Sequence, residues 1–211
     1  MHTLLLTLLL TTLAPGSLSE TLTDQGFEDV PVYEETQNAT NIEPKVPKNY
    51  DKAKHKPGKD LGQSPNTLTV EGVDFPFEDL SGNTGVGEDA AELKATLDQQ
   101  KAVQVGMNGI RTFFGHYYNY GTSVFNPLDD QNLLKEGSVV SITDNKGETK
   151  TYEITQVFGV PYEDQYDYFY NKDPLPYLAY FGNGEDMVYI QYCRWDIELG
   201  YLKTAIGYRV D

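Results

Sequence analysis

Two residues far apart in the chain have side chains suited to nucleophilic chemistry: Cys193, which is the only cysteine, and His116. A thiolate attacks carbonyl carbons near neutral pH when a neighbouring cation lowers its pKa, and a histidine can supply that cation. The other histidines, His2 and His55, fall in segments with no folding signal, so His116 is the sole candidate base. One cysteine excludes an internal disulfide and a multi-cysteine metal site, and no cofactor is indicated.

A lone cysteine is also compatible with two roles that involve no catalysis. It is more often a small buried hydrophobe than a nucleophile, and it can also form an intermolecular link. The order along the chain, with histidine before cysteine, differs from that of papain-like proteases.

The two candidate residues each end a predicted strand. Residues 188–193 alternate in the way of a half-buried strand that finishes at Cys193. Residues 110–116 form a second predicted strand, which runs into a tight turn at Gly115 and His116. The chemistry therefore requires that the sheet bring these two strand ends together.

The rest of the folded region, residues 66–211, is predicted to be mainly β. Its other predicted strands are 67–70, 75–77, 138–143, 149–160 and 202–210, with a turn at 144–147. The prediction is a closed or nearly closed β-barrel of about eight strands with one or two short helices.

Local patterns add detail to this barrel. Residues 88–100 show helical spacing of apolar side chains, and a short helix is predicted from Asn126, as its cap, with Pro127 in its first turn. In the strand 149–160, the side chains of Tyr152, Ile154 and Phe158 are predicted to share one face.

The first 65 residues lack the pattern of a folded domain. Residues 1–19 are leucine-rich and are predicted to be a signal peptide or a short membrane anchor, which implies an extracytoplasmic protein. Residues 20–65 are predicted to be a disordered, charged linker. Its lysine cluster between 45 and 59 favours a solvated tether, with contact to an anionic cell wall or membrane as the alternative.

The charge balance excludes one class of partner. With 32 acidic residues against 16 basic ones, the formal net charge is −16, which repels phosphate backbones and makes nucleic acid a poor partner. Sixteen tyrosines favour strands and aromatic-lined surfaces over helices.

The order of these motifs resembles that of sortases, bacterial cysteine transpeptidases, over about residues 66–210. The resemblance is carried by a Gly-His turn, a Phe-x-x-Leu segment, a strand start of the Leu-x-x-Gly-Asp kind and a cysteine ending the penultimate strand. The matching residues are Gly115-His116, Phe125, Leu128, Leu134 to Val140, Tyr152-Glu153-Ile154 and Cys193. Ser138 replaces the usual aspartate, and the strand end reads Tyr-Ile-Gln-Tyr-Cys where sortases have Thr-Leu-x-Thr-Cys.

The resemblance implies a β-barrel that cleaves a Leu-Pro-x-Thr-Gly-type sorting signal and transfers the acyl group to an amine on the cell surface. Cys193 is then the nucleophile and His116 the general acid. The family's arginine at the start of the last strand is missing, and Lys203 is nearest to its place, although a shift of one residue favours Leu202 or Thr204.

Three tyrosines are expected at the substrate. Tyr192 keeps a hydroxyl where the family has threonine, and Tyr166 and Tyr168 lie where sortases carry a loop that walls the peptide groove. The acidic residues of that loop do not match a calcium-binding loop of the EF-hand type, so no metal is assigned. The alternative function is a catalytically inactive sortase-fold module that binds or scaffolds at the surface.

Overall fold

A computed structural model describes residues 45, 47, 50, 56–83, 89–107, 110–117, 122–161, 186–195 and 200–211. Within these ranges, the side chains of residues 90, 107, 160, 161, 193–195, 200 and 201 are not described. The elements are β1 (Lys59–Asp60), β2 (Thr67–Val70), β3 (Val73–Leu80), α1 (Asp89–Leu97), β4 (Ala102–Met107), β5 (Ile110–Gly115), α2 (Asn126–Asp130), β6 (Val139–Thr143), β7 (Glu148–Pro161), β8 (Met187–Trp195) and β9 (Gly200–Arg209).

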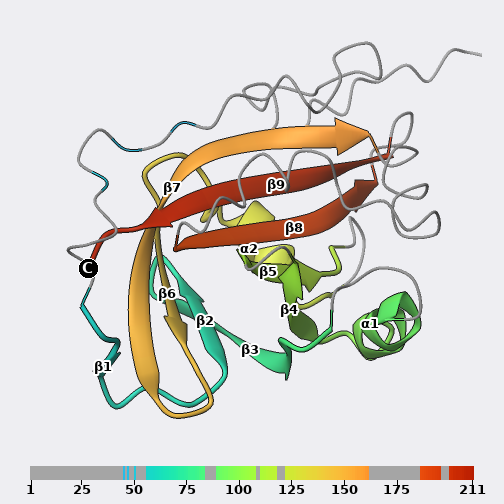
Figure 1. Cartoon of the computed structure of the whole chain (residues 1–211). Helices are drawn as coiled ribbons and strands as arrows, with labels where there is room; N and C mark the ends of the chain where they lie inside the picture. The colour runs from blue at the N-terminus through green and yellow to red at the C-terminus, as the bar shows by residue number, and fades with distance from the viewer. Residues whose placement is uncertain are drawn as a thin grey trace, which may run out of the picture.

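The described strands form one sheet that closes on itself. Their order is β1-β7-β6-β2-β3-β4-β5-β8-β9, and an additional pairing between β7 and β9 joins the two sides of the sheet. Eight strands therefore make a closed barrel, and the two-residue strand β1 is added along β7. In Figure 1, β7, β9 and β8 run side by side across the top, and α1 lies at the side near β4. The predicted mainly β, closed fold with two short helices is confirmed.

The barrel has two hydrophobic clusters, one on each face of the sheet. The interior cluster collects side chains from all eight barrel strands and from the segment around α2. Its members are Leu68, Val70, Phe75, Phe77, Ala102, Phe113, Tyr117, Phe125, Leu128, Leu134, Val140, Ile142, Tyr152, Ile154, Val188, Ile190, Tyr192 and Ala205. Each fully buried large side chain of this kind contributes about 1.5–3 kcal/mol, so the interior cluster is the main source of stability.

The outer cluster lies where α1 packs on the other face of the sheet. The cluster joins Leu93 of α1 with apolar residues from β4, β5, β7, β8 and β9, and these include Phe158, Leu202 and Tyr208. Tyr50 packs against this cluster from the N-terminal segment, with its ring 5.0 Å from that of Tyr208.

A β-bulge in β7 explains why one sequence prediction was wrong. Ile154 pairs with Gly207 and Gln156 with Ile206, so Thr155 is an extra residue without a partner on β9. One extra residue reverses which side chains face inward. Ile154 therefore belongs to the interior cluster and Phe158 to the outer cluster, although simple alternation puts them on one face.

Three further local features differ from the sequence predictions or add to them. Phe125, and not Asn126, is the N-cap of α2, without a side-chain capping bond, while Pro127 does lie in the first turn. The strand β4 was not predicted. β1 lies inside the range that was predicted as linker. A two-residue strand paired through its backbone carries too little side-chain pattern to be seen in a sequence.

Candidate active site

The register between β5 and β8 brings His116 and Cys193 to neighbouring positions. The two strands are parallel, and their last register pair is Gly115 with Tyr192. His116 directly follows Gly115, and Cys193 directly follows Tyr192. Neighbouring strands of a sheet lie about 4.8 Å apart, so the two residues begin side by side. The structure describes the backbone of Cys193 and not its side chain.

Gly115 is required by the close approach of an aromatic ring. A Cβ atom on this residue would lie 2.3 Å from Cδ2 of Phe125, whose side chain is fully buried. The backbone N–H of Phe125 donates to the carbonyl oxygen of His116 at 3.1 Å, and the hydroxyl of Ser123 donates to the same oxygen. The Gly-His turn and the Phe-x-x-Leu segment are thus two halves of one packing contact.

The surroundings of His116 favour its neutral form. The side chain is partly buried, and this burial lowers the pKa of the imidazole below its usual value of 6.5. The carboxylate of Asp98 acts in the opposite direction, and the ammonium of Lys94 adds to the lowering. Lys94 and Asp98 form an ion pair of 2.7 Å at the end of α1, so their charges act on His116 in opposite directions, and burial has the largest effect.

The residue opposite Cys193 in the antiparallel pairing of β8 and β9 is Leu202. Its side chain is 2% exposed and belongs to the outer cluster. Lys203, which the sequence places nearest to the family's arginine, is instead the register partner of Tyr192. Successive residues of a strand point to opposite faces, so Lys203 and Leu202 lie on different faces of β9.

Lys203 is held inside the protein by an acid that sequence reasoning missed. Its Nζ lies 3.0 Å from Oδ1 of Asp129, and the two side chains are 3% and 7% exposed. The hydroxyl of Tyr192 donates to the same Oδ1, also at 3.0 Å. The only sequence signal for Asp129 is its place directly after Leu128 of the Phe-x-x-Leu segment.

The three tyrosines expected at the substrate have different outcomes. Tyr192 is 1% exposed and lies in the interior cluster, with its ring 6.1 Å from those of Phe125 and Tyr117. Tyr166 and Tyr168 lie outside the described residues, as does the acidic loop considered for calcium. Among the residues that the structure describes, no group of three or more His, Cys, Asp or Glu is arranged to hold a metal ion.

Buried polar side chains line the outer face directly before the candidate site. Gln191, two residues before Cys193, donates from Nε2 to the hydroxyl oxygen of Tyr189 at 2.8 Å and to Oγ1 of Thr204 at 2.9 Å. Gln191 and Thr204 are register partners, so these bonds join β8 and β9 on this face as well.

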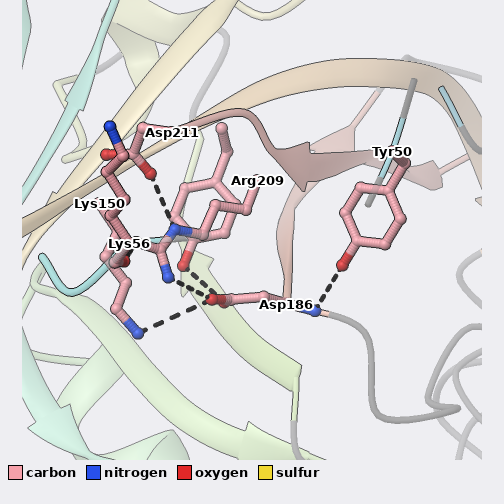
Figure 2. A network of polar contacts seen from close by, with 7 residues as sticks. Tyr50, Lys56, Lys150, Asp186, Arg209 and Asp211 are labelled. Carbon is pink, nitrogen blue, oxygen red and sulfur yellow. Dashed lines mark hydrogen bonds and ion pairs between the residues drawn. The ribbon is translucent and has the colours of Figure 1, made fainter. Parts of the chain in front are cut away.

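Arg209, the other cation of β9, is committed to a network far from Cys193. Figure 2 shows it between Asp186 and Asp211, which it contacts at 2.8 Å each, and it also donates to the carbonyl oxygen of Lys56. Tyr50 accepts a hydrogen bond from the backbone N–H of Asp186 in the same network. Arg209 therefore joins the N-terminal segment to the chain end.

A cavity of about 530 Å³ opens at the far end of the barrel. Arg111, Asp79 and Lys146 are among its lining residues. Arg111 pairs with Val188 near the start of β8, whereas Cys193 lies near the end of that strand. The cavity is therefore separate from the candidate active site.

Comparison with protein-family models and with curated proteins finds no match. Comparison with solved structures finds sortases. Sortase C1 of Streptococcus agalactiae matches with a TM-score of 0.46 and 17% identity, over 69% of this chain and 67% of that chain. Sortase A of Corynebacterium diphtheriae matches with a TM-score of 0.44 and 20% identity, over 69% of this chain and 60% of that chain. Sortase C-1 of Actinomyces oris matches with a TM-score of 0.43 and 20% identity, over 69% of this chain and 71% of that chain.

These solved structures are similar to this chain in fold, at 17–20% identity. This chain spans less than two thirds of the sortase A chain. No described helix has the length and apolar character needed to cross a membrane.

Proposed function

We propose that this protein is an extracytoplasmic, sortase-like cysteine transpeptidase in which Cys193 and His116 form the reactive pair. The single observation that carries the proposal is the register of β5 and β8, in which both residues directly follow the pair Gly115 and Tyr192. Acyl transfer by a thiol requires a base within reach of the sulfur, and His116 is the only histidine outside residues 1–65.

The reaction has two halves. His116 takes the proton of the thiol, and the Cys193 sulfur attacks the threonyl carbonyl of a Leu-Pro-x-Thr-Gly-type sorting signal. The Thr–Gly bond then breaks, and His116 returns the proton to the departing glycine amine, leaving a thioester on Cys193. An amine of a surface acceptor attacks the thioester, loses a proton to His116 and releases the thiol.

The environment of His116 fits the first of these steps. A pKa lowered by burial leaves the imidazole unprotonated at neutral pH, so that it is able to accept the thiol proton. After this transfer, the imidazolium of His116 stabilises the thiolate of Cys193.

Among the residues that the structure describes, no cation holds the register position opposite Cys193, near which sortases carry an arginine. Leu202 holds the register position opposite Cys193, and the ammonium of Lys203 is bound by Asp129. Loss of one donor to the negative oxygen of a tetrahedral intermediate costs about 10²–10³ in rate. We therefore expect acyl transfer that is slow, and we assign Lys203 a positioning role.

The proposed partners follow from the reaction class. They are the sorting-signal peptide of a surface protein and an amine on the cell wall or on another protein. Residues 1–19, as a signal peptide or short anchor, and the charged linker after them would place the barrel outside the cell, with a possible membrane tether.

The test is direct detection of the thioester. The whole chain is incubated with a library of sorting-signal peptides, and mass spectrometry is used to find an acyl adduct on Cys193. We expect an adduct on the wild type and none on Cys193→Ala, with the rate lowered about 10²–10⁴-fold in His116→Gln. No adduct with any peptide, or an adduct formed equally well by His116→Gln, would contradict the proposed mechanism.

A second candidate function is a non-catalytic sortase-fold module that binds peptides at the surface. Leu202 opposite Cys193 favours it, because an apolar side chain stabilises no developing negative charge. Peptide binding measured by calorimetry, with equal affinity for the wild type and Cys193→Ala and no adduct in either, would establish this function in place of the enzyme.

A further inference from the structure

Asp129 makes a buried connection between the two strands next to the candidate site. Its Oδ1 accepts hydrogen bonds from the hydroxyl of Tyr192 on β8 and from Nζ of Lys203 on β9, both at 3.0 Å. The ammonium of Lys203 also lies 6.0 Å from the centre of the Tyr192 ring. All three side chains are nearly inaccessible to solvent.

Burial makes this arrangement specific. A buried ammonium that loses its carboxylate partner is an unpaired charge, which strongly destabilises the folded state. The same cost applies to a buried carboxylate that loses its hydrogen-bond donors. The side chains of Asp129, Tyr192 and Lys203 therefore hold one geometry together, and a change in one of them moves the others.

The connection lies directly beside the reactive pair. Tyr192 precedes Cys193 and pairs with both Gly115 on β5 and Lys203 on β9. A carboxylate that binds Tyr192 and Lys203 thus acts on the three strands at the level where His116 and Cys193 begin.

The same segment also holds the other member of the pair. The backbone N–H of Phe125, the N-cap of α2, donates to the carbonyl oxygen of His116. Asp130, the neighbour of Asp129, accepts a hydrogen bond from the hydroxyl of Tyr117 at 3.3 Å. Consecutive acids at the end of α2 therefore bind the residue after His116 and the residue before Cys193.

We infer that Asp129 is a positioning residue of the active site, which acts through Tyr192 and Lys203 to hold Cys193 at the level of His116. The inference rests on the proposed function, since it concerns the same reactive pair. It also gives a reason for Lys203, which lies on the face of β9 opposite to that of Leu202. The charge of Lys203 holds the strand end in place through Asp129 and does not contact the reacting oxygen.

The test uses the fact that Cys193 is the only cysteine of the chain. The rate of alkylation of the whole protein by iodoacetamide, measured from pH 5 to 10, then reports on one thiol. A thiol paired with a histidine reacts at lower pH than a free cysteine, whose pKa is about 8.5. We expect such a low-pH limb in the wild type and its loss in His116→Gln.

For Asp129→Asn we expect a profile displaced toward that of a free cysteine, with the rate at pH 6.5 lowered about tenfold. The control is Asp74→Asn, at an acid of β3 that accepts a hydrogen bond from Oγ1 of Thr69 at 2.7 Å and contacts neither Tyr192 nor Lys203 in the described hydrogen bonds. We expect its profile to match that of the wild type.

Stability is separated from positioning by a double variant. Asp129→Leu with Lys203→Met removes both buried charges at similar volume, so we expect it to recover the melting temperature that Asp129→Asn loses. We expect its alkylation profile to remain displaced. A profile that returns to that of the wild type together with the melting temperature would overturn the inference.

The outcomes for the inference and for the proposed function are distinct. If His116→Gln differs from the wild type and folded Asp129→Asn does not, Asp129 has no positioning role and the reactive pair stands. If the wild type and His116→Gln give one profile, or if the folded wild type does not react at any pH, the pair itself is refuted and the inference falls with it.

Discussion

Leu202 of β9 lies directly opposite Cys193 of β8 in the antiparallel register. Its side chain is buried with α1 and β7 in the outer cluster. The position that faces the candidate nucleophile is thus apolar, while the neighbouring cation is bound to Asp129 on the other face of the strand. Under the proposed function, this relationship predicts slow acyl transfer.

A guanidinium at the position of Leu202 should therefore accelerate thioester formation. Leu202→Arg places a planar donor opposite Cys193, and the long apolar stem of arginine is able to stay in the outer cluster while its head reaches the site. We expect adduct formation with a sorting-signal peptide to rise by up to about 10²-fold, measured by mass spectrometry. Leu202→Met keeps the volume without the charge. Equal rates in both folded variants would contradict the prediction.

The contact between Gly115 and Phe125 predicts a large effect of one methyl group. In Gly115→Ala the new Cβ would lie 2.3 Å from the ring, which cannot move freely because it packs against Phe75 and Tyr192. We expect a loss of about 1–3 kcal/mol in the free energy of urea unfolding. Gly82→Ala has nothing within 4 Å of its new Cβ and should stay within about 0.5 kcal/mol of the wild type.

The lowered pKa of His116 predicts that stability falls on acidification. The folded protein binds the proton of His116 less readily than the unfolded chain does, so stability is lost as the pH drops below 6.5 toward the folded pKa. Urea unfolding of the wild type and His116→Gln at pH 8 and pH 5 measures this. The wild type should lose more stability than the variant. An equal loss in both proteins would show that His116 is no more buried in the folded state than in the unfolded chain.

Asp186 predicts a second pH dependence, at lower pH. Burial alone would raise the pKa of Asp186, but hydrogen bonds from Arg209 and Tyr152 and the charge of Lys150 together lower it below 3.8. The stability that Asp186 contributes is therefore present above pH 3.8 and is lost as the pH falls through the folded pKa.

Asp186→Asn should thus cost about 1.5–3 kcal/mol at neutral pH, because it weakens hydrogen bonds to a charged group. The difference in unfolding free energy from the wild type should shrink as the pH is lowered toward 3. Lys101→Gln is a suitable control, since its ion pair with Glu78 is exposed and should contribute less than about 1 kcal/mol. A difference that stays constant with pH would contradict the assignment.

Much of the fold and the candidate reactive pair follows from local sequence pattern. Alternating apolar residues indicate β2, β6 and β8, and the turn before Gly147 indicates a hairpin, because strand periodicity and turn chemistry are properties of adjacent residues. The scarcity of thiols and imidazoles also singles out Cys193 and His116 without any structure.

Only the tertiary structure decides which residues those strands bring together. The bulge at Thr155 moves Phe158 to the outer cluster, the β8–β9 register puts Leu202 and not Lys203 opposite Cys193, and α2 supplies Asp129 to Lys203. Each of these depends on a shift of one residue between strands that are distant in the chain. A shift of that size changes the face and the partner of a side chain but leaves the alternation within either strand unaltered.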